Sequence, residues 1–240
     1  MTSLAQFIQY IISGMTSGSI YAMVGLCWSI VFLVTGILNF STGEFVMLGG
    51  MFTWLLLDAG MGLGPAILVA VMATVLVGIV IERLVIRPVR FPSETTFMVI
   101  TIASASILKG IILIACGSET HAVPPLVPAK QFSVLGAVVT SQALLVLAVL
   151  VIIAVGLSLF LNRTLLGKAL RATAINPNGA ALVGIRIRTL IVFCFGLAGG
   201  IGAVAGVVIA PITFTGYNIG LMTGMKGLVA AIVGGWTMTG

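Results

Sequence analysis

Charge is what this sequence has least of. Only 7% of its 240 residues are charged, five of them acidic and eleven basic, whereas a soluble domain carries roughly 25%. The acids are too scattered to pair for general acid–base catalysis. The basic residues form no basic face and do not alternate with aromatics, so the net charge of +6 does not indicate a nucleic-acid partner. With 60% hydrophobic residues, the chain is expected to be an integral membrane protein surrounded by lipid.

Metal ligands and nucleophiles are equally scarce. The single histidine, His121, lies in a loop, and the three cysteines lie in or beside apolar segments without a metal-ligand spacing: Cys27, Cys116 and Cys194. No phosphate-binding G-x-x-x-x-G-K-[ST] motif is present, because Ala169 follows Gly167-Lys168 where a Ser or Thr is required. The zinc and serine-hydrolase motifs H-E-x-x-H and G-x-S-x-G are absent too. We therefore expect no catalytic residue, no metal site and no cofactor.

Long apolar runs predict an all-α polytopic membrane protein, since a spanning helix needs about 20 apolar residues. One transmembrane domain is expected over residues 1–240, with about six to seven helices at residues 7–34, 45–57, 65–81, 95–116, 138–161, 190–210 and 225–240. Residues 1–6 carry no Lys or Arg, so the first segment is a retained span rather than a signal peptide. Pro211 is expected to end the sixth run. The last run is shorter than a crossing, which predicts a truncated sequence with further C-terminal helices.

Two features of the first and fourth runs concern packing. The first run has a stripe of small residues at helical spacing, which predicts close approach of another helix: Gly14, Gly18, Ala22 and Gly25. Lys109 lies inside the fourth run. Its side chain is expected to extend to the outer interface, and a place in a substrate path is the alternative.

The basic residues fall in two loops, which predicts that both loops face the cytoplasm. The first loop contains Arg83, Arg87 and Arg90, and the second contains Arg163, Lys168, Arg171, Arg186 and Arg188. The N-terminus and a proline-rich loop at about residues 117–137 then lie outside.

The second basic loop, about residues 162–189, has room for two short helices. Residues 167–175 are rich in Ala and Leu and favour a helix. Asn176-Pro177 ends it and can start another, with Asn176 as N-cap and Pro177 at the first helical position. Gly184 is suited to the position after the second helix. Such a helix could dock a cytosolic partner, and the alternative is a solvated loop whose charge only sets the topology.

Residues 35–50 form a polar, glycine-containing break after the first span. Asn39, Ser41, Thr42 and Glu44 lie here beside Gly43, and the apolar run that follows is too short to span. Either Glu44 caps a helix at the membrane surface, or a broken helix reaches into the membrane as part of a translocation path. Irregular backbone at that depth requires protein or a cavity around it, and an ionisable group there is a functional candidate.

A similar polar, glycine-containing sequence recurs late in the chain. TGILN…STG at residues 35–43 resembles TGYN…MTG at residues 215–224, and Gly49-Gly50 resembles Gly234-Gly235. The two preceding spans would cross in opposite directions, so this is a weak inverted repeat, which is typical of transporters with a site near the midplane. The candidates for the path or a gate are Asn39, Gly43, Glu44 and Asn218.

Three stretches together resemble a known family. They are GSIYAMVGLCWSIVFLVTGILNFSTGEFVMLGG (residues 18–50), GKALRATAINPNGAALVGI (residues 167–185) and GLVAAIVGGWTMTG (residues 227–240), with RPVR at residues 87–90 before a Thr-rich span. In this order they resemble the permeases of branched-chain amino-acid ABC importers of the LivH type. The loop lacks the Glu-Ala-Ala start and Leu-Pro end of general ABC importers, so only the Liv-type version of the loop carries over.

The resemblance implies a multi-pass permease of the bacterial cytoplasmic (inner) membrane that moves branched-chain or related small amino acids inward. It implies four partners: a second, LivM-like permease, two cytosolic ATPase subunits that hydrolyse ATP, and a periplasmic substrate-binding protein. The residues of the implied ATPase-coupling loop are Gly167, Arg171, Ala172, Asn176, Pro177, Ala180, Ala181 and Gly184. The alternative is an ATP-independent secondary transporter or channel for a small polar solute, which the glycine-interrupted repeat fits equally well. A membrane enzyme would need a catalytic constellation that is not visible.

Overall fold

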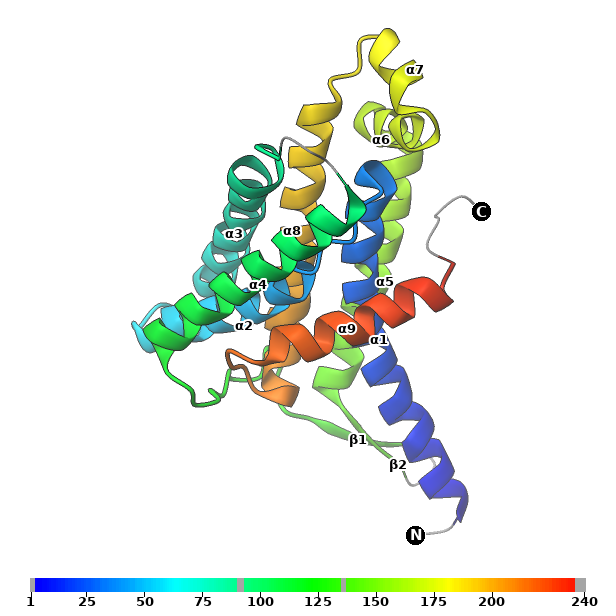
Figure 1. Cartoon of the computed structure of the whole chain (residues 1–240). Helices are drawn as coiled ribbons and strands as arrows, with labels where there is room; N and C mark the ends of the chain where they lie inside the picture. Colours follow the sequence, from blue (N-terminus) through cyan, green and yellow to red (C-terminus); the bar gives the residue numbers. More distant parts are fainter. Residues whose placement is uncertain (1–2, 90–92, 135–136, 236–240) are drawn as a thin grey trace.

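The computed structural model describes residues 3–89, 93–134 and 137–235. The chain is helical apart from one short hairpin in these ranges (Figure 1). Arg90 and residues 236–240 lie outside the described residues. In chain order the elements are α1 (Ser3–Thr35), α2 (Thr42–Asp58), α3 (Leu63–Ile81), the π-helical turn η1 (Glu82–Ile86), α4 (Glu94–Cys116), β1 (Gln131–Val134), β2 (Ala137–Thr140), α5 (Ser141–Arg163), α6 (Leu165–Ile175), α7 (Pro177–Leu182), α8 (Ile187–Thr213) and α9 (Ile219–Val233).

Five described helices are long and apolar enough to cross a membrane: α1, α3 continued by η1, α4, α5 and α8. The shorter helix α9 is also apolar, and α2 is a 17-residue helix inside the bundle. This architecture confirms the expected all-α polytopic membrane fold.

Helices α2 and α8 form the centre of the molecule. The first ten residues of α2 are all buried, and α8 is buried along most of its length between α1, α2 and α3. Glycines allow these helices to approach closely. A side-chain carbon at Gly78 of α3 would lie 2.5 Å from the Phe195 carbonyl oxygen of α8, a distance that no side chain can occupy. The core is therefore a glycine-mediated helix packing of the kind found in membranes.

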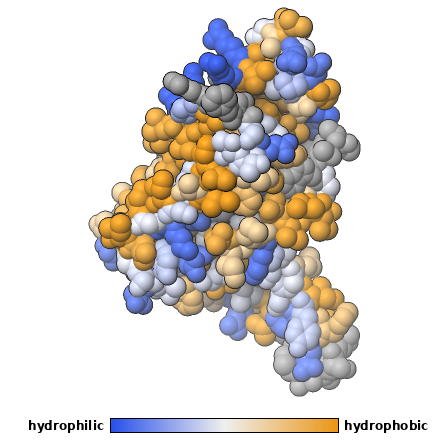
Figure 2. Space-filling model, in the orientation of Figure 1, coloured by the Kyte–Doolittle hydropathy of each residue, from blue (hydrophilic) through white to orange (hydrophobic). Residues whose placement is uncertain are grey.

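The two ends of the bundle differ. In Figure 1, α6 and α7 lie at the same end as the top of α3, whereas the N-terminus and the β1–β2 hairpin lie at the opposite end. Arg83 and Arg87 of the first basic loop follow α3 directly. Figure 2 shows hydrophobic surface across the middle of the molecule, with hydrophilic residues both toward the α6–α7 end and on the lower left of the view. The described basic residues of both loops thus share one end, as expected for a cytoplasmic side.

Several expectations about element boundaries are wrong. Helix α8 continues through Pro211 to Thr213 and stops at Phe214, which has φ +60°. Proline in the last turn removes few backbone hydrogen bonds, and membrane helices tolerate it when neighbouring protein covers the backbone. Helix α9 begins at Ile219 rather than at residue 225. The outer loop contains the antiparallel pair β1–β2, in a stretch expected to be irregular.

The small-residue stripe on α1 is used at only part of its length. A side-chain carbon at Gly25 would lie 3.2 Å from the Gly227 carbonyl oxygen and 3.4 Å from the Ala231 nitrogen, both on α9. At Gly14 and Gly18 such a carbon would meet no described atom within 4 Å. Both of these glycines are exposed.

Candidate functional site

The segment between α5 and α8 folds as two helices joined at Asn176, which we call the elbow (residues 164–186). Its capping is local, as the sequence predicted. The Asn176 side chain accepts a hydrogen bond from the Gly179 N–H at 2.9 Å, and Pro177 occupies the first turn of α7. At the other end Gly184 has φ +86°, its N–H donates to the Ala181 carbonyl, and the Ile185 N–H donates to the Ala180 carbonyl. This is a Schellman ending with glycine at the C′ position.

The elbow is anchored to the bundle through α6. Gly167 lies against the Phe160 and Leu161 backbone of α5, where a side-chain carbon would collide. Leu170 is buried in the core. Arg171 donates to the Asn162 side chain, and the Ala172 carbonyl accepts the Asn176 N–H at 3.0 Å. The Gly167, Leu170 and Arg171 contacts join α6 to α5 and the core, and α7 projects beyond them.

The outward surface of the elbow is apolar. Leu182 is 89% exposed, and Ile175 and Val183 are nearly as open. Leu165 and Leu166 at the start of α6 are exposed as well. Figure 2 shows hydrophobic and hydrophilic residues side by side at the α6–α7 end of the molecule. Exposed aliphatic side chains on the basic, water-facing end of a membrane protein are typical of a protein contact.

One expected contact residue points the other way. Ala180 is buried, with 4% of its surface exposed, while Ala181 is exposed. Ala180 therefore packs α7 against the rest of the chain and does not face a partner. The sequence signal that could have identified the outward face is the run Leu182-Val183, two large aliphatic residues beside a helix-ending glycine.

The second candidate region is the break between α1 and α2, whose polar side chains are buried. Asn39, Ser41 and Thr42 have no exposed surface, and Glu44 is 2% exposed. Glu44 is thus enclosed by protein, and its role as a translocation-path element or as a cap at the membrane surface stays a prediction. The Ser41 N–H is accepted by the Asn39 side-chain oxygen at 3.1 Å, which closes the turn locally.

This break is also tied to α4. The Ser41 hydroxyl donates to the Thr101 carbonyl at 2.9 Å, and the Thr101 hydroxyl donates to the Met98 carbonyl at 3.0 Å. Four buried side-chain polar atoms find no hydrogen-bond partner among the described residues, and two of them lie in this region: Asn39 Nδ2 and Glu44 Oε2. Buried polar groups are nearly always hydrogen-bonded, so these two atoms are the unusual feature of the region.

The segment between α8 and α9 (residues 214–218), called the late break, lies close to the break between α1 and α2. Gly43 of α2 packs on Gly224 of α9, where a side-chain carbon on either residue would lie less than 3.0 Å from the other's Cα. A carbon at Gly220 would lie 2.7 Å from Glu44 Cδ. The structure therefore places Gly43 and Glu44 against the first turns of α9, directly after Asn218.

Lys109 of α4 links the two breaks. Its ammonium donates to the Asn218 side-chain oxygen at 2.6 Å and lies 5.4 Å from the centre of the Tyr217 ring. It also interacts electrostatically with Glu44. Half-buried Lys109 therefore has partners within the chain, in the segment between α8 and α9. Its extension to the outer interface stays a prediction. Glu44, Asn39, Lys109 and Asn218, together with Tyr217, are called the polar centre below.

The outer loop closes over the late break. His121 and Thr215 form an isolated antiparallel bridge, with N–H to carbonyl distances of 2.7 and 2.9 Å. The His121 ring stacks on Trp54 near the end of α2, with 3.5 Å between ring centres. The loop residue His121 thus contacts both the end of α2, through Trp54, and the segment between α8 and α9, through Thr215.

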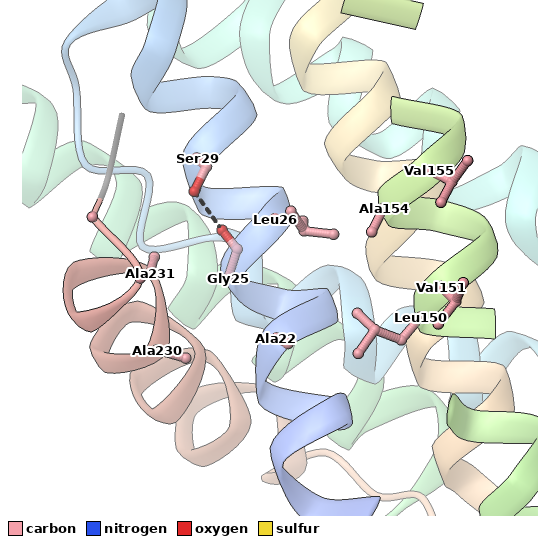
Figure 3. Close-up of a pocket in the computed structure, with 12 residues that line it drawn as sticks. Ala22, Gly25, Leu26, Ser29, Leu150, Val151, Ala154, Val155, Ala230 and Ala231 are labelled. Carbon is pink, nitrogen blue, oxygen red and sulfur yellow. Dashed lines mark hydrogen bonds between the residues drawn. The ribbon is translucent and has the colours of Figure 1, made fainter. Parts of the chain in front are cut away.

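A cavity of about 590 Å³ lies between α1, α5 and α9 (Figure 3). Aliphatic side chains such as Leu26 and Leu150 line it. Ser29 is the one side-chain polar group among its twelve lining residues, and its hydroxyl donates to the Gly25 carbonyl at 2.9 Å. The Ser29 hydroxyl proton is already engaged and the other lining side chains are aliphatic or absent, so the cavity is poorly suited to a charged solute.

Comparison with known proteins agrees with a transporter architecture. The family model for the permease component of the branched-chain amino acid transport system matches residues 10–240. The chain belongs to this permease family. Among curated relatives, the chain is 28% identical to the high-affinity branched-chain amino acid transport system permease protein BraD of Pseudomonas aeruginosa, over 98% of this chain and 81% of BraD.

Further relatives of this permease lie at similar or greater distance. LivH of Escherichia coli, a high-affinity branched-chain amino acid transport system permease protein, is 29% identical over 95% of this chain and 79% of LivH. LsrC of Yersinia enterocolitica, an autoinducer 2 import system permease protein, is 25% identical over 87% of this chain and 56% of LsrC. No solved structure matches the chain. The permease is thus a membrane-embedded transport component, and its family are inner-membrane proteins that are not themselves enzymes.

Proposed function

We propose that this permease moves branched-chain or related small amino acids inward across the bacterial cytoplasmic membrane, driven by ATP hydrolysis in two cytosolic ATPase subunits. A second, LivM-like permease and a periplasmic substrate-binding protein complete the complex. The observation that carries the proposal is the elbow, a rigidly anchored helix pair with exposed aliphatic residues at the basic end of the bundle.

The elbow couples the ATPases to the spans in this proposal. Leu182, Val183 and Ile175 insert into an apolar cleft of the ATPase, and the surrounding Arg163, Lys168 and Arg186 favour an acidic rim. Because α6 is locked onto α5 and the core by Gly167 and Leu170, movement of α7 is transmitted to the bundle. Closure of the ATPases then shifts the permease between two states that open to opposite sides.

The polar centre is the proposed path or gate. The unpartnered Asn39 Nδ2 is a donor and the unpartnered Glu44 Oε2 is an acceptor, so a passing solute can satisfy both, and Lys109 supplies a positive charge that interacts with Glu44. A carboxylate and an ammonium close together complement the two charges of an amino acid. The arrangement supports passage of a small zwitterion better than passage of an apolar or purely anionic solute.

Co-purification with the ATPases tests the elbow. Leu182→Asp places a charge on the centre of the exposed aliphatic patch without disturbing a buried contact. Truncating a central contact residue of an interface costs about 2 kcal/mol or more, which is roughly a thirtyfold loss of affinity. Met61→Asp is the matched control, because Met61 is also an exposed aliphatic residue but lies in the α2–α3 turn at the other end of the bundle.

We expect the ATPases to co-purify with the unaltered permease and with Met61→Asp, and to be lost from Leu182→Asp. If Leu182→Asp retains them fully, the docking face lies elsewhere. If no ATPase associates with any variant and uptake into proteoliposomes follows an ion gradient instead of ATP, the secondary-transporter alternative replaces this proposal.

A further inference from the structure

Helix α9 carries one charged residue, Lys226, in an otherwise apolar sequence. The face of α9 that packs into the protein is made of small buried residues, and the opposite face is exposed. Lys226 lies on the exposed face, among apolar side chains that are also exposed: Met222, Met225 and Val229. The chain therefore presents a single cation on an apolar helix surface.

Lys226 lies near half the length of the spanning helices. The next residue, Gly227, is at the crossing with α1, because a side-chain carbon at Gly25 would lie 3.2 Å from the Gly227 carbonyl oxygen. Figure 3 shows this part of α1 facing residues 150–155 of α5, which lie at the middle of that 23-residue span. The crossing is therefore halfway along a helix that is long enough to cross the bilayer.

The Lys226 side chain does not reach the membrane surface. Its ammonium donates to the Tyr21 hydroxyl at 3.2 Å and lies 5.2 Å from the centre of the Tyr21 ring. Tyr21 is one turn of α1 before Gly25, which is about 5.4 Å along the helix axis. Half of the hydrocarbon thickness is about 15 Å, so the ammonium stays well inside the apolar layer.

Among the described residues Lys226 forms a hydrogen bond with Tyr21 but no ion pair. The helices packed most closely against α9 are α1, which has no acid, and α2, which has Glu44 and Asp58. Glu44 interacts with Lys109, and Asp58 is at the far end of α2 from its contact with α9. A charged group at this depth nearly always pairs with another charge or borders a water-filled cavity. The Lys226 ammonium therefore requires an anion that this part of the chain does not supply.

The two side chains together offer donors without acceptors to match. An ammonium has three N–H donors, and Lys226 uses one of them on Tyr21. Because the Tyr21 oxygen accepts that bond, its own O–H is left to donate, and it has no acceptor among the described residues. The Tyr21 ring packs against the buried cluster that contains Val24 and Trp28, which positions the hydroxyl. A carboxylate accepts hydrogen bonds at both of its oxygens, so it complements this pair of donors.

We propose that Lys226 and Tyr21 form a binding site for the carboxylate of a small organic acid or amino acid, near half depth on the outer face of the α1–α9 pair. The carboxylate binds the ammonium and accepts the Tyr21 O–H, and an apolar side chain of the solute lies against Met222, Met225 or Val229. This site is separate from the polar centre, since Glu44 lies against the buried face of α9 at Gly220. Water must reach the α1–α9 face for such a solute to bind. The inference rests on the proposed function only in taking a transported amino acid as the source of the carboxylate.

Protection of a neighbouring cysteine from a water-soluble, charged thiol reagent tests the site. The three native cysteines, Cys27, Cys116 and Cys194, are replaced by alanine, and Met222→Cys, one turn before Lys226 and 63% exposed at the native methionine, becomes the reporter. The complete complex is labelled in proteoliposomes without ATP, with and without isocaproate, which is leucine without its amino group. Isocaproamide, of the same shape but without the charge, is the control ligand. Ile152→Cys, exposed at about the same depth on α5, is the control for background labelling.

We expect Met222→Cys to be labelled faster than Ile152→Cys, and isocaproate to slow its labelling in a saturable way while isocaproamide does not. Lys226→Met should lose this protection and keep the labelling rate measured without ligand, whereas Lys226→Arg should retain the protection. Tyr21→Phe removes one hydrogen bond to a charged group and should weaken isocaproate binding about tenfold.

The proposal is overturned if Met222→Cys is labelled no faster than Ile152→Cys, because the face is then closed to water and the counter-charge comes from a neighbouring subunit. It is also overturned if isocaproamide protects as well as isocaproate, or if protection persists in Lys226→Met. Leucine uptake is measured separately in the same proteoliposomes. Protection together with uptake that follows an ion gradient instead of ATP would contradict the proposed function and support this site.

Discussion

The elbow and the α1–α2 break are both short polar interruptions of an apolar chain, yet they differ in burial and in how their polar groups are hydrogen-bonded. The elbow satisfies its helix ends with its own residues, through the Asn176 side chain and the Gly184 turn, and exposes large aliphatic residues. The polar residues of the break are buried, the Ser41 hydroxyl donates to the Thr101 carbonyl of α4, and the Asn39 Nδ2 and Glu44 Oε2 atoms have no partner among the described residues.

This difference separates two kinds of function. A self-contained, exposed helix pair can bind another protein without rearranging the bundle that carries it. A buried break with unsatisfied polar atoms has free energy to gain from a solute or from a second conformation, because an unpaired buried group costs about 1–3 kcal/mol. The elbow therefore suits coupling, and the break suits the transport path.

The largest expected effect on folding comes from a substitution at the close contact between Gly43 of α2 and Gly224 of α9. Gly43→Leu forces a side chain into the contact with Gly224, where even one carbon would be less than 3.0 Å away. Overpacking of a tight core costs about 1–3 kcal/mol and sometimes more, and here the neighbour is backbone that cannot move aside. We expect loss of the monodisperse peak in detergent gel filtration and a large fall in Tm. Gly156→Leu, in open space on α5, should leave both unchanged, and equal behaviour of the two variants would contradict the close crossing.

The next effect separates charge from packing in the polar centre. Glu44→Gln keeps the shape of a buried side chain and removes the charge beside Lys109. If the polar centre lies in the path, uptake should fall about tenfold or more while expression and ATPase association stay normal. Glu94→Gln, at the exposed start of α4, is the control with little effect. Full uptake by Glu44→Gln would remove any need for this carboxylate in transport.

The smallest effect concerns the elbow's own capping. Asn176→Ala removes the hydrogen bond to the Gly179 N–H, and loss of such a cap costs about 1 kcal/mol. We expect faster amide hydrogen exchange in residues 178–183 and a several-fold weaker ATPase association. Asn178→Ala leaves the cap in place and should exchange at the original rate. If Asn176→Ala exchanges no faster than this control, the cap does not hold α7.

The sequence predicted the elbow well because its determinants are close in the chain. Asn176, Pro177 and Gly184 act through backbone conformation and hydrogen bonds over three to five residues. They fix the start of α7 at Pro177 and its end before Gly184, as the structure confirms. Span positions were also accessible, because long apolar runs have few alternatives in a membrane.

Tertiary partners could not be predicted in the same way. The small residues of the α1 stripe look equivalent in sequence, yet Gly25 meets α9 closely, whereas a side-chain carbon at Gly14 or Gly18 would meet no described atom within 4 Å. The burial of Ala180 depends on how α7 folds back, and the direction of Lys109 depends on where Asn218 comes to lie. The roles of the elbow and the polar centre in coupling and transport stay predictions.

The most direct measurement is ATP hydrolysis and amino-acid uptake, recorded together, by the complete complex in proteoliposomes. The two variants are Leu182→Asp and Glu44→Gln. We predict that Leu182→Asp loses both activities because the ATPases no longer bind, whereas Glu44→Gln keeps bound ATPases and loses uptake. Uptake and hydrolysis that remain coupled at normal rates in Leu182→Asp would contradict the assignment of the elbow as the site of ATPase coupling.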